Sequence, residues 1–225
     1  MEHPILFLDL LFSSFGLHIP PHVTYTWVII LLLVGLGLLA SRQISLVPKG
    51  AQNVFELIVG GLEEFMVEIT GEEGRAFFPF IATFFLFIMF CNLVGLLPGF
   101  FSPTANINTT LSLALCTFAY THYLGVKYHG VKYVKHFLGP IPALAPLFFP
   151  IEIIGHFARV LSLTLRLFGN IMGEDLVLAI LLFLAGNFLA PLPMMFLAVF
   201  TSVVQAFVFT LLSMMYFAGS MEHAH

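Results

Sequence analysis

The strongest constraint on the fold is a series of continuous apolar segments, most of them close to 20 residues long. Of the 225 residues, 60% are hydrophobic and only 9% are charged, whereas a soluble globular domain has about 25% charged residues. Apolar runs of this length are typical of helices that cross a membrane. Because the runs are continuous rather than alternating, they favour helices over a β-barrel. The sequence therefore predicts an all-α integral membrane protein, and its net charge of −4 argues against nucleic-acid binding.

We expect a single integral membrane domain over residues 1–225, with about five membrane-spanning helices. Their expected ranges are 25–40, 77–97, 109–123, 151–186 and 194–217. Residues 1–22 are expected to be an irregular, external segment. Pro140, Pro142, Pro146 and Pro150 are expected to break the chain before the fourth span.

Residues 51–70 predict a different kind of helix. Apolar residues recur there at steps of three and four, but Glu56, Glu63, Glu64 and Glu68 lie between them. Four glutamates exclude an ordinary span, so the pattern indicates an amphipathic helix along the membrane surface. Its acidic polar face favours packing against protein rather than lipid. An ordinary connecting helix without a specific role is an equal alternative.

The basic residues predict the orientation in the membrane. Arg42, Lys49 and Arg75 flank the amphipathic segment, and three lysines lie within residues 125–137. The loops near 98–108 and 187–193 contain no Lys or Arg. By the positive-inside rule, the N-terminus is external and the C-terminus is cytoplasmic.

The fourth span carries a polar stripe within an apolar helix. At about 100° per residue, six polar side chains share an arc of roughly 80°: Glu152, His156, Arg159, Arg166, Asn170 and Glu174. Asp175 faces elsewhere. Ionisable residues at membrane depth mark ion or proton pathways by default, so this stripe is the candidate functional site.

The same span is too long to stand upright in a membrane. Residues 151–186 would measure about 50 Å at 1.5 Å per residue, against a hydrocarbon core of about 30 Å. The helix must therefore tilt strongly, or bend near Gly169 or Gly173. Together with residues 194–217 it forms the predicted hairpin, over about 151–217.

Arg159 and Arg166 are fixed positive charges, because an arginine side chain keeps its proton in a protein. Neither can carry a proton. Arg159 has three interpretations: it pairs with Glu152, two turns away, it extends its charge to a membrane interface, or it takes part in function. For Arg166 the acidic residues of its own helix, Glu174 and Asp175, lie two turns or more away, so a partner on another chain is expected.

Three histidines spaced by seven, His122, His129 and His136, could suggest metal or haem ligands. Since they lie in and around a lysine-rich segment, a solvated loop is the favoured interpretation. A membrane redox or haem protein using His122, His129 and His156 remains the alternative, although the sequence indicates no paired histidines on two facing spans. A self-contained channel is a third possibility.

Several motifs resemble subunit a of the bacterial F-type (F1Fo) ATP synthase. They are LSLTLRLFGNI at 161–171, NLVGLLPG at 92–99, PTANINTTLSLAL at 103–115 and TSVVQAFVFTLLSMMYF at 201–217. The resemblance implies a stator subunit in the bacterial inner membrane that passes protons or Na⁺ through two half-channels to a ring of c subunits, the c-ring. It implies subunit b of the peripheral stalk as a further partner, no cofactor and no catalytic activity of its own.

The resemblance also implies roles for individual residues. Arg166 matches the essential arginine that faces the c-ring carboxylate, and Asn170 and Gln205 match polar positions near it. Glu152 and Asp175 match positions assigned to the external half-channel.

Further expectations concern the stripe and two departures from the family pattern. Glu174 and His156 are expected to line the ion pathway. Ala198 stands where a relative has a histidine, and His156 is the candidate replacement. Asn106 stands where some relatives have Asp.

Overall fold

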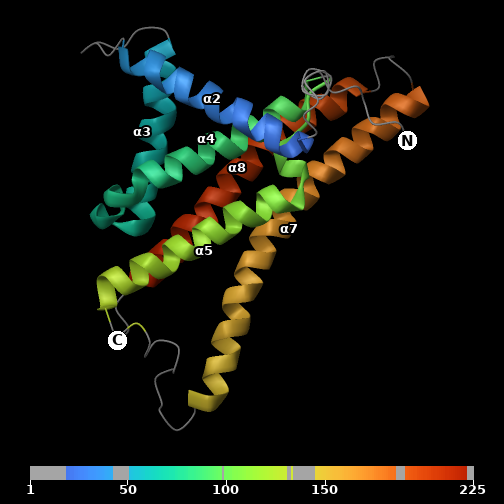
Figure 1. Cartoon of the computed structure of the whole chain (residues 1–225). Helices are drawn as coiled ribbons and strands as arrows, with labels where there is room; N and C mark the ends of the chain where they lie inside the picture. The colour runs from blue at the N-terminus through green and yellow to red at the C-terminus, as the bar shows by residue number, and fades with distance from the viewer. Residues whose placement is uncertain are drawn as a thin grey trace.

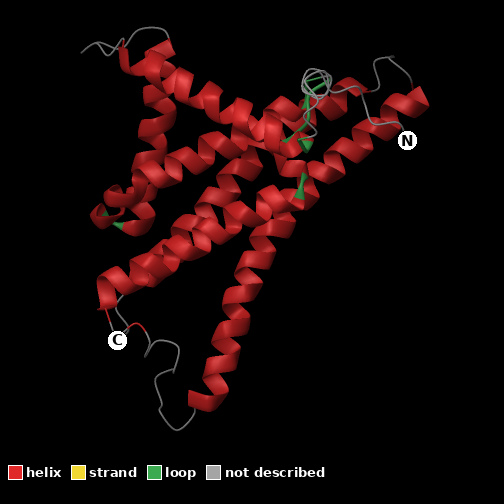
Figure 2. Ribbon diagram, in the orientation of Figure 1, coloured by secondary structure: helices red, strands yellow, loops and turns green. Residues whose placement is uncertain are grey.

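The computed structural model describes residues 19–42, 51–97, 99–130, 133, 145–185 and 191–221. Within these ranges the chain forms helices and no strand (Figures 1 and 2). The α-helices are α2 (Pro21–Arg42), α3 (Ala51–Thr70), α4 (Phe78–Gly95), α5 (Ile107–His129), α7 (Ala145–Ala185) and α8 (Pro191–Met221). Two 3₁₀ helices, η1 (Glu72–Phe77) and η2 (Pro103–Ala105), precede α4 and α5. The all-α prediction is confirmed.

Four helical segments are long and apolar enough to cross a membrane: Pro21–Leu39, Glu72–Gly95, Phe148–Leu184 and Pro191–Met221. The fifth expected span, α5, has 23 residues and is therefore about 35 Å long. It is less apolar because it carries many hydroxyl groups. Thr110, Thr117 and Thr121 are buried against the protein, and Thr121 bonds the carbonyl of Thr117. A helix whose polar face packs against other helices, and not against lipid, can cross a membrane even though its mean hydropathy is lower.

Helices α4, α5 and α8 form the centre of the bundle, and α7 packs against α5 and α8 (Figure 1). Aromatic rings fill the space between them. Phe80 stacks on Tyr120, with ring centroids 4.4 Å apart, and Phe217 contacts both rings. The core also buries Ile81, Ile88, Leu167 and Met214 completely. This packing fixes which faces of α7 and α8 remain outside the core.

Helix α2 contacts the bundle through only part of its length. Near its start, Tyr25 is buried and donates a hydrogen bond of 3.1 Å to the carbonyl of Gly99. Further along, Trp27, Leu31 and Leu38 are exposed. An exposed apolar surface of this kind suits lipid or another membrane helix.

Helix α7 begins earlier than the sequence predicts. Pro146 and Pro150 were expected to break the chain, yet both lie within the helix, which starts at Ala145. Proline is tolerated in the first turn because its missing N–H has no partner there, which accounts for Pro146. Pro150 lies inside the helix, and its missing N–H removes one hydrogen bond of the helix there. Pro140 and Pro142 lie outside the described residues. The 41 residues span about 60 Å, and Figure 1 shows that α7 changes direction about midway, as its length requires.

Helix α3 confirms the predicted helix over residues 51–70. Leu62 and Met66 are buried against the bundle, while Glu56, Glu64 and Glu68 are exposed. In Figure 1, α3 runs across the ends of α2 and α4 rather than alongside them. Gly71 (φ 72°) ends the helix, a conformation that glycine adopts without strain, and Arg75 then pairs with Glu63 and Glu72.

The segment after the third predicted span is helical for longer than expected. His122 and Lys127 were assigned to a solvated loop region, but α5 continues to His129. Gly130 (φ 56°) then ends the helix. The basic residues Lys127 and His129 lie in its last turn, where the charge of Lys127 complements the helix dipole. His136, Lys132 and Lys135 lie outside the described residues.

Candidate functional site

Arg166 lies near the middle of α7, and its charge is not neutralised by the described part of the chain. Its Nη2 donates a hydrogen bond of 3.3 Å to Ser162 Oγ. It forms no ion pair with a carboxylate in the described ranges, although it is partly exposed on an apolar helix. The neighbouring Leu161 and Leu165 are exposed too. A charge in this position calls for a carboxylate from another chain, as the sequence predicted.

One turn from Arg166, the two helices of the hairpin are joined by a polar contact. Asn170 Nδ2 donates a hydrogen bond of 2.7 Å to Gln205 Oε1. Gln205 is 5% exposed. Its Nε2 and the nearby Ser202 Oγ have no hydrogen-bond partner among the described residues. The resemblance implied only that Asn170 and Gln205 lie near the arginine, and the structure adds this direct bond between them.

A buried chain of hydrogen bonds leads from η2 to the same part of α8. Ser102 Oγ donates to the carbonyl of Cys91 and shares a hydrogen bond of 2.8 Å with Thr104 Oγ1. Thr104 donates to Asn92 Oδ1 at 2.6 Å, and Asn92 Nδ2 donates to the Ser202 carbonyl at 3.2 Å. The side chains of Ser102, Thr104 and Asn92 are all buried. Sequence reasoning missed this network, although an asparagine within an apolar span and an uncharged loop with several polar residues were its signals.

Glu174 and Asp175 lie on the carboxyl-terminal side of Asn170. Both are partly exposed and close enough to interact electrostatically, and Glu174 is within hydrogen-bonding reach of Thr201 on α8. Carboxyl groups in such a partly open position can take up and release protons.

The amino-terminal half of α7 carries a separate cluster. His156 Nε2 lies 3.4 Å from Glu152 Oε1, and its ring centroid is 4.9 Å from that of His122 on α5. His122 Nδ1 lies 2.8 Å from the hydroxyl of Tyr133. Burial raises the pKa of Tyr133, which keeps the phenol neutral and able to donate a proton to a hydrogen bond. The sequence indicated no histidine pair on facing helices, and the structure corrects that.

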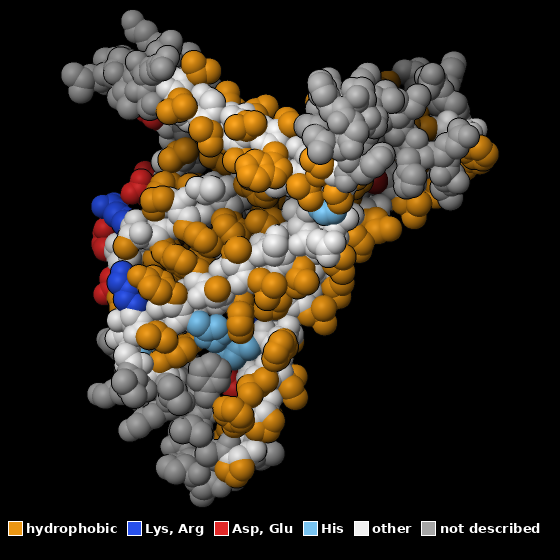
Figure 3. Space-filling view, viewed as in Figure 1, with side chains coloured by type: hydrophobic (Ala, Val, Ile, Leu, Met, Phe, Trp, Pro, Cys, Tyr) orange, Lys and Arg blue, Asp and Glu red, His pale blue; other side chains and the backbone are white. Residues whose placement is uncertain are grey.

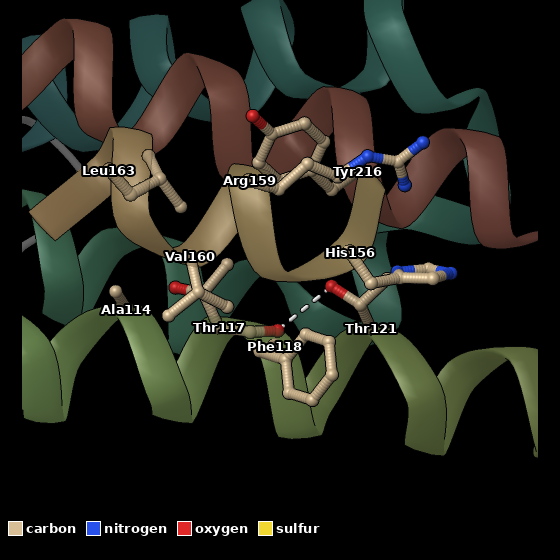
Figure 4. Close-up of a pocket in the computed structure, with 9 residues that line it drawn as sticks. All are labelled: Ala114, Thr117, Phe118, Thr121, His156, Arg159, Val160, Leu163 and Tyr216. Atoms are coloured by element: carbon tan, nitrogen blue, oxygen red, sulfur yellow. Dashed lines mark hydrogen bonds between the residues drawn. The ribbon is translucent and has the colours of Figure 1, made fainter. Parts of the chain in front are cut away.

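Arg159 does not pair with Glu152. Its guanidinium carbon lies 5.5 Å from the centroid of the Tyr216 ring on α8, a cation–π contact, and in the described ranges it forms no ion pair. The Glu152 carboxylate is instead beside His156. Figure 4 shows Arg159 beside Tyr216, with His156 about one turn away on the same helix.

A small cavity lies between α5, α7 and α8 at this cluster (Figure 4). Its volume is about 250 Å³ including its open mouth, and its polar lining comes from Thr117, Thr121, His156, Arg159 and Tyr216. Pockets for small molecules or cofactors have volumes of about 300–1,000 Å³, so the cavity is too small for a haem. No group of three potential metal ligands occurs in the described residues.

Two expectations about the stripe do not fit the geometry. His156 precedes Asn170 by fourteen positions, and Ala198 precedes Gln205 by seven. Because Asn170 contacts Gln205 in an antiparallel pair, the levels of His156 and Ala198 are about 30 Å apart at 1.5 Å per residue. His156 therefore does not replace a histidine at position 198. Likewise, Glu152 and Asp175 lie on opposite sides of Arg166 along α7, which does not suit one shared passage.

Comparison with known proteins gives a consistent result over the whole chain. The family model described as "ATP synthase A chain" matches residues 23–218. The protein named ATP synthase subunit a from Syntrophobacter fumaroxidans is 61% identical over 239 residues, and the one from Desulfosudis oleivorans is 59% identical over 229. A third, from Citrifermentans bemidjiense, is 54% identical over 233 residues. Each alignment covers 100% of both chains.

Proposed function

The chain belongs to the ATP synthase A chain family, and we propose that it passes ions between the membrane surfaces and a c-ring. As a subunit a it is a membrane component of the F1Fo ATP synthase. The observation that carries the proposal is Arg166, a fixed positive charge on an apolar helix with no carboxylate partner in the described part of the chain. The haem alternative is not supported, because the cavity beside the histidines is too small.

Arg166 would act on a carboxylate of each passing c subunit. A guanidinium close to a carboxyl group favours its ionised form, so the carboxyl must release its ion when it reaches Arg166. The permanent positive charge also repels cations that would otherwise pass straight along α7. Both effects make the ion travel with the ring, which couples ion flow to rotation. The chain itself would catalyse no ATP chemistry.

The polar groups on either side of Arg166 supply the two half-channels. We assign Asn170, Gln205, Glu174 and Asp175 to the external passage. The buried chain from Ser102 to Asn92 reaches the same part of α8 and supports a polar route from η2. We assign Glu152 and His156 to the cytoplasmic passage, because they lie on the other side of Arg166.

The orientation rests on where basic residues gather. Lys127 and His129 lie at the carboxyl end of α5, and His129 Nε2 lies 3.1 Å from the carbonyl of Ser220 near the end of α8. Figure 3 shows the Lys and Arg side chains of this view together along one edge of the molecule. By the positive-inside rule we propose that this edge is cytoplasmic, with the end of α8 inside and the start of α2 outside.

The partners follow from the exposed surface and the family. Helices α7 and α8 expose Phe157, Leu161, Phe196 and Phe200, and we propose that this apolar surface faces the c-ring. Helix α3 would lie along the cytoplasmic surface of the bacterial inner membrane. Subunit b would hold the chain against the torque of the ring as part of the peripheral stalk.

Membranes containing the complete complex test the proposal. In Arg166→Ala membranes, ATP-driven ion pumping should be lost while the soluble sector still hydrolyses ATP. The matched control is Arg75→Ala, which removes an exposed arginine that pairs with Glu63 and Glu72. Pumping measured with and without Na⁺ identifies the ion. Undiminished pumping in Arg166→Ala would refute the proposal.

A further inference from the structure

His122 and His156 come together from two different helices. The residues are far apart in the sequence, yet their ring centroids are 4.9 Å apart at an interplanar angle of 51°. Phe118 contacts both rings edge-on, at 4.3 Å and 6.0 Å between centroids. His156 is 8% exposed and lines the cavity between α5, α7 and α8. Two imidazoles are therefore held close together, with their ring planes tilted, next to space that opens to the outside.

Charged and titratable groups face the pair from every helix around it. Glu152 and Arg159 belong to α7, and the Glu152 carboxylate is 3.4 Å from His156 Nε2. Tyr133, which follows α5, contacts His122 Nδ1 at 2.8 Å. From α8, Tyr216 lines the cavity and contacts Arg159. The pair thus has a carboxylate at one end, a phenol at the other and a permanent cation beside it.

We propose that His122 and His156 act as a proton-relay pair between this cavity and Glu152, on the cytoplasmic side of Arg166. The inference rests on the proposed function, since it assigns these side chains to the cytoplasmic passage. It adds His122, which lies on α5, to an ion pathway otherwise built from the hairpin.

The transfer conserves protons at each step. A proton leaving towards the cytoplasm moves from the Glu152 carboxyl group to His156 Nε2, which leaves Glu152 as a carboxylate and His156 as an imidazolium. The imidazolium releases its Nδ1–H proton, directly or through one water, to His122 Nε2, which can accept it when the His122 Nδ1–H donates to the Tyr133 hydroxyl oxygen. His122 then releases the proton from Nε2 to water in the cavity, and both rings are neutral again. His156 now carries its N–H on Nε2, and this proton returns to Nδ1 by exchange with water or by ring rotation before the next transfer. Protons entering from the cytoplasm follow the reverse order.

Arg159 limits the pair to a single positive charge. Two adjacent imidazolium rings would repel each other and the nearby guanidinium. The Glu152 carboxylate can balance one of these charges. A pair that holds one proton at a time takes up the next only after the first has left, which suits a relay. Tyr133 is a positioning residue, because its contact with Nδ1 orients the His122 ring.

Vesicles with the complete complex provide the test. We expect His122→Gln and His156→Gln each to lower proton transport per assembled complex about tenfold, a modest fraction of what general acid–base groups contribute. Proton transport in the double variant should equal that of the single variant with the lower rate, because both residues belong to one relay. The variants should also lose the dependence of the rate on cytoplasmic pH between about 5 and 8, where histidine titrates. Added imidazole should restore part of the rate in His156→Ala.

The matched control is His129→Gln, which removes a histidine from the same helix, two turns further on. It should keep the rate and the pH dependence, and imidazole should not affect it. Subunit content is measured first, so a variant that assembles poorly is still compared per complex. If both glutamine variants keep the wild-type rate and pH profile while Arg166→Ala blocks transport, the relay is wrong and the proposed function stands. Retained transport in Arg166→Ala would overturn the proposed function instead.

Discussion

Asn170 on α7 donates a hydrogen bond of 2.7 Å to Gln205 on α8, one turn from Arg166. The bond fixes how far the two helices are shifted along each other. It therefore determines which residues of α8 lie beside the arginine. Gln205 is buried and Asn170 is exposed, so the contact lies at the edge of the interface, on the side where a rotor would pass.

Removing either end of this bond should impair transport without preventing assembly. We expect Asn170→Ala or Gln205→Ala to lower ATP-driven pumping by a few fold, because interhelical hydrogen bonds in membranes contribute about 0.6 kcal/mol and at most about 1.7. The double variant should lose less than the product of the two single effects. Asn53→Ala, which changes an exposed amide on α3, should have no effect. Independent, multiplicative losses would show that the two residues do not act together.

The two acidic residues beyond Asn170 should differ in their importance. Asp175→Asn keeps the shape of the side chain but cannot carry a proton, so proton transport should fall at least about tenfold. Glu174→Gln should lower proton transport less, because Glu174 is the less buried of the two and water can substitute for its carboxyl group. Initial rates of proton uptake into vesicles measure both. Glu68→Gln on α3 serves as the control, and wild-type transport in Asp175→Asn would remove Asp175 from the pathway.

The buried network around Asn92 should matter for stability. Asn92→Leu removes two hydrogen bonds and leaves the Thr104 hydroxyl and the Ser202 carbonyl buried without this partner, which costs about 1–3 kcal/mol. Thermal unfolding of the detergent-solubilised complex should begin at a lower temperature. Thr83→Val is the matched control, because exposed Thr83 on the same helix bonds only the carbonyl of Pro79. Equal unfolding temperatures for the two variants would contradict the prediction.

Gly95 permits a close approach between the end of α4 and the segment before η2. A Cβ atom on Gly95 would lie 2.4 Å from the Ser102 Cβ and 3.1 Å from its Cα. Gly95→Ala should therefore push Ser102 away, at a cost of about 1–3 kcal/mol for overpacking. Gly60→Ala in α3 meets nothing within 4 Å and should be neutral or slightly stabilising, since alanine favours helices. The yield of folded complex after mild heating measures the difference and should be lower for Gly95→Ala than for Gly60→Ala.

Much of the fold could be predicted because it follows from local patterns. Apolar runs and their polar interruptions identified the six α-helices described by the structure, including the amphipathic α3, but not the short 3₁₀ helices η1 and η2. The predicted end of α5 and the predicted start of α7 were wrong. Prolines near a helix start cost little, which the sequence does not reveal. Polar residues such as Lys127 can likewise extend a helix beyond the apolar run.

The candidate site was only partly predictable. Arg166 stood out because a charge in an apolar helix is rare and costly. The family resemblance drew attention to Asn170 and Gln205, but only the structure shows that they contact each other. The partner of Arg159 was missed because Glu152 is near in sequence, whereas Tyr216 belongs to another helix. The network around Asn92 was missed because it joins α4, η2 and α8.

The sequence by itself determined that the chain is helical, lies in a membrane and carries a positive charge on a polar stripe. These properties depend on hydrophobicity and on a period of 3.6 residues, which are both local. Only the tertiary structure decided that His122 meets His156, that Arg159 meets Tyr216, and that Asn92 reaches the carbonyl of Ser202. A helix satisfies its backbone hydrogen bonds internally, however it is shifted or rotated relative to its neighbours, so these bonds do not select an arrangement. Side-chain packing between helices therefore selects one arrangement.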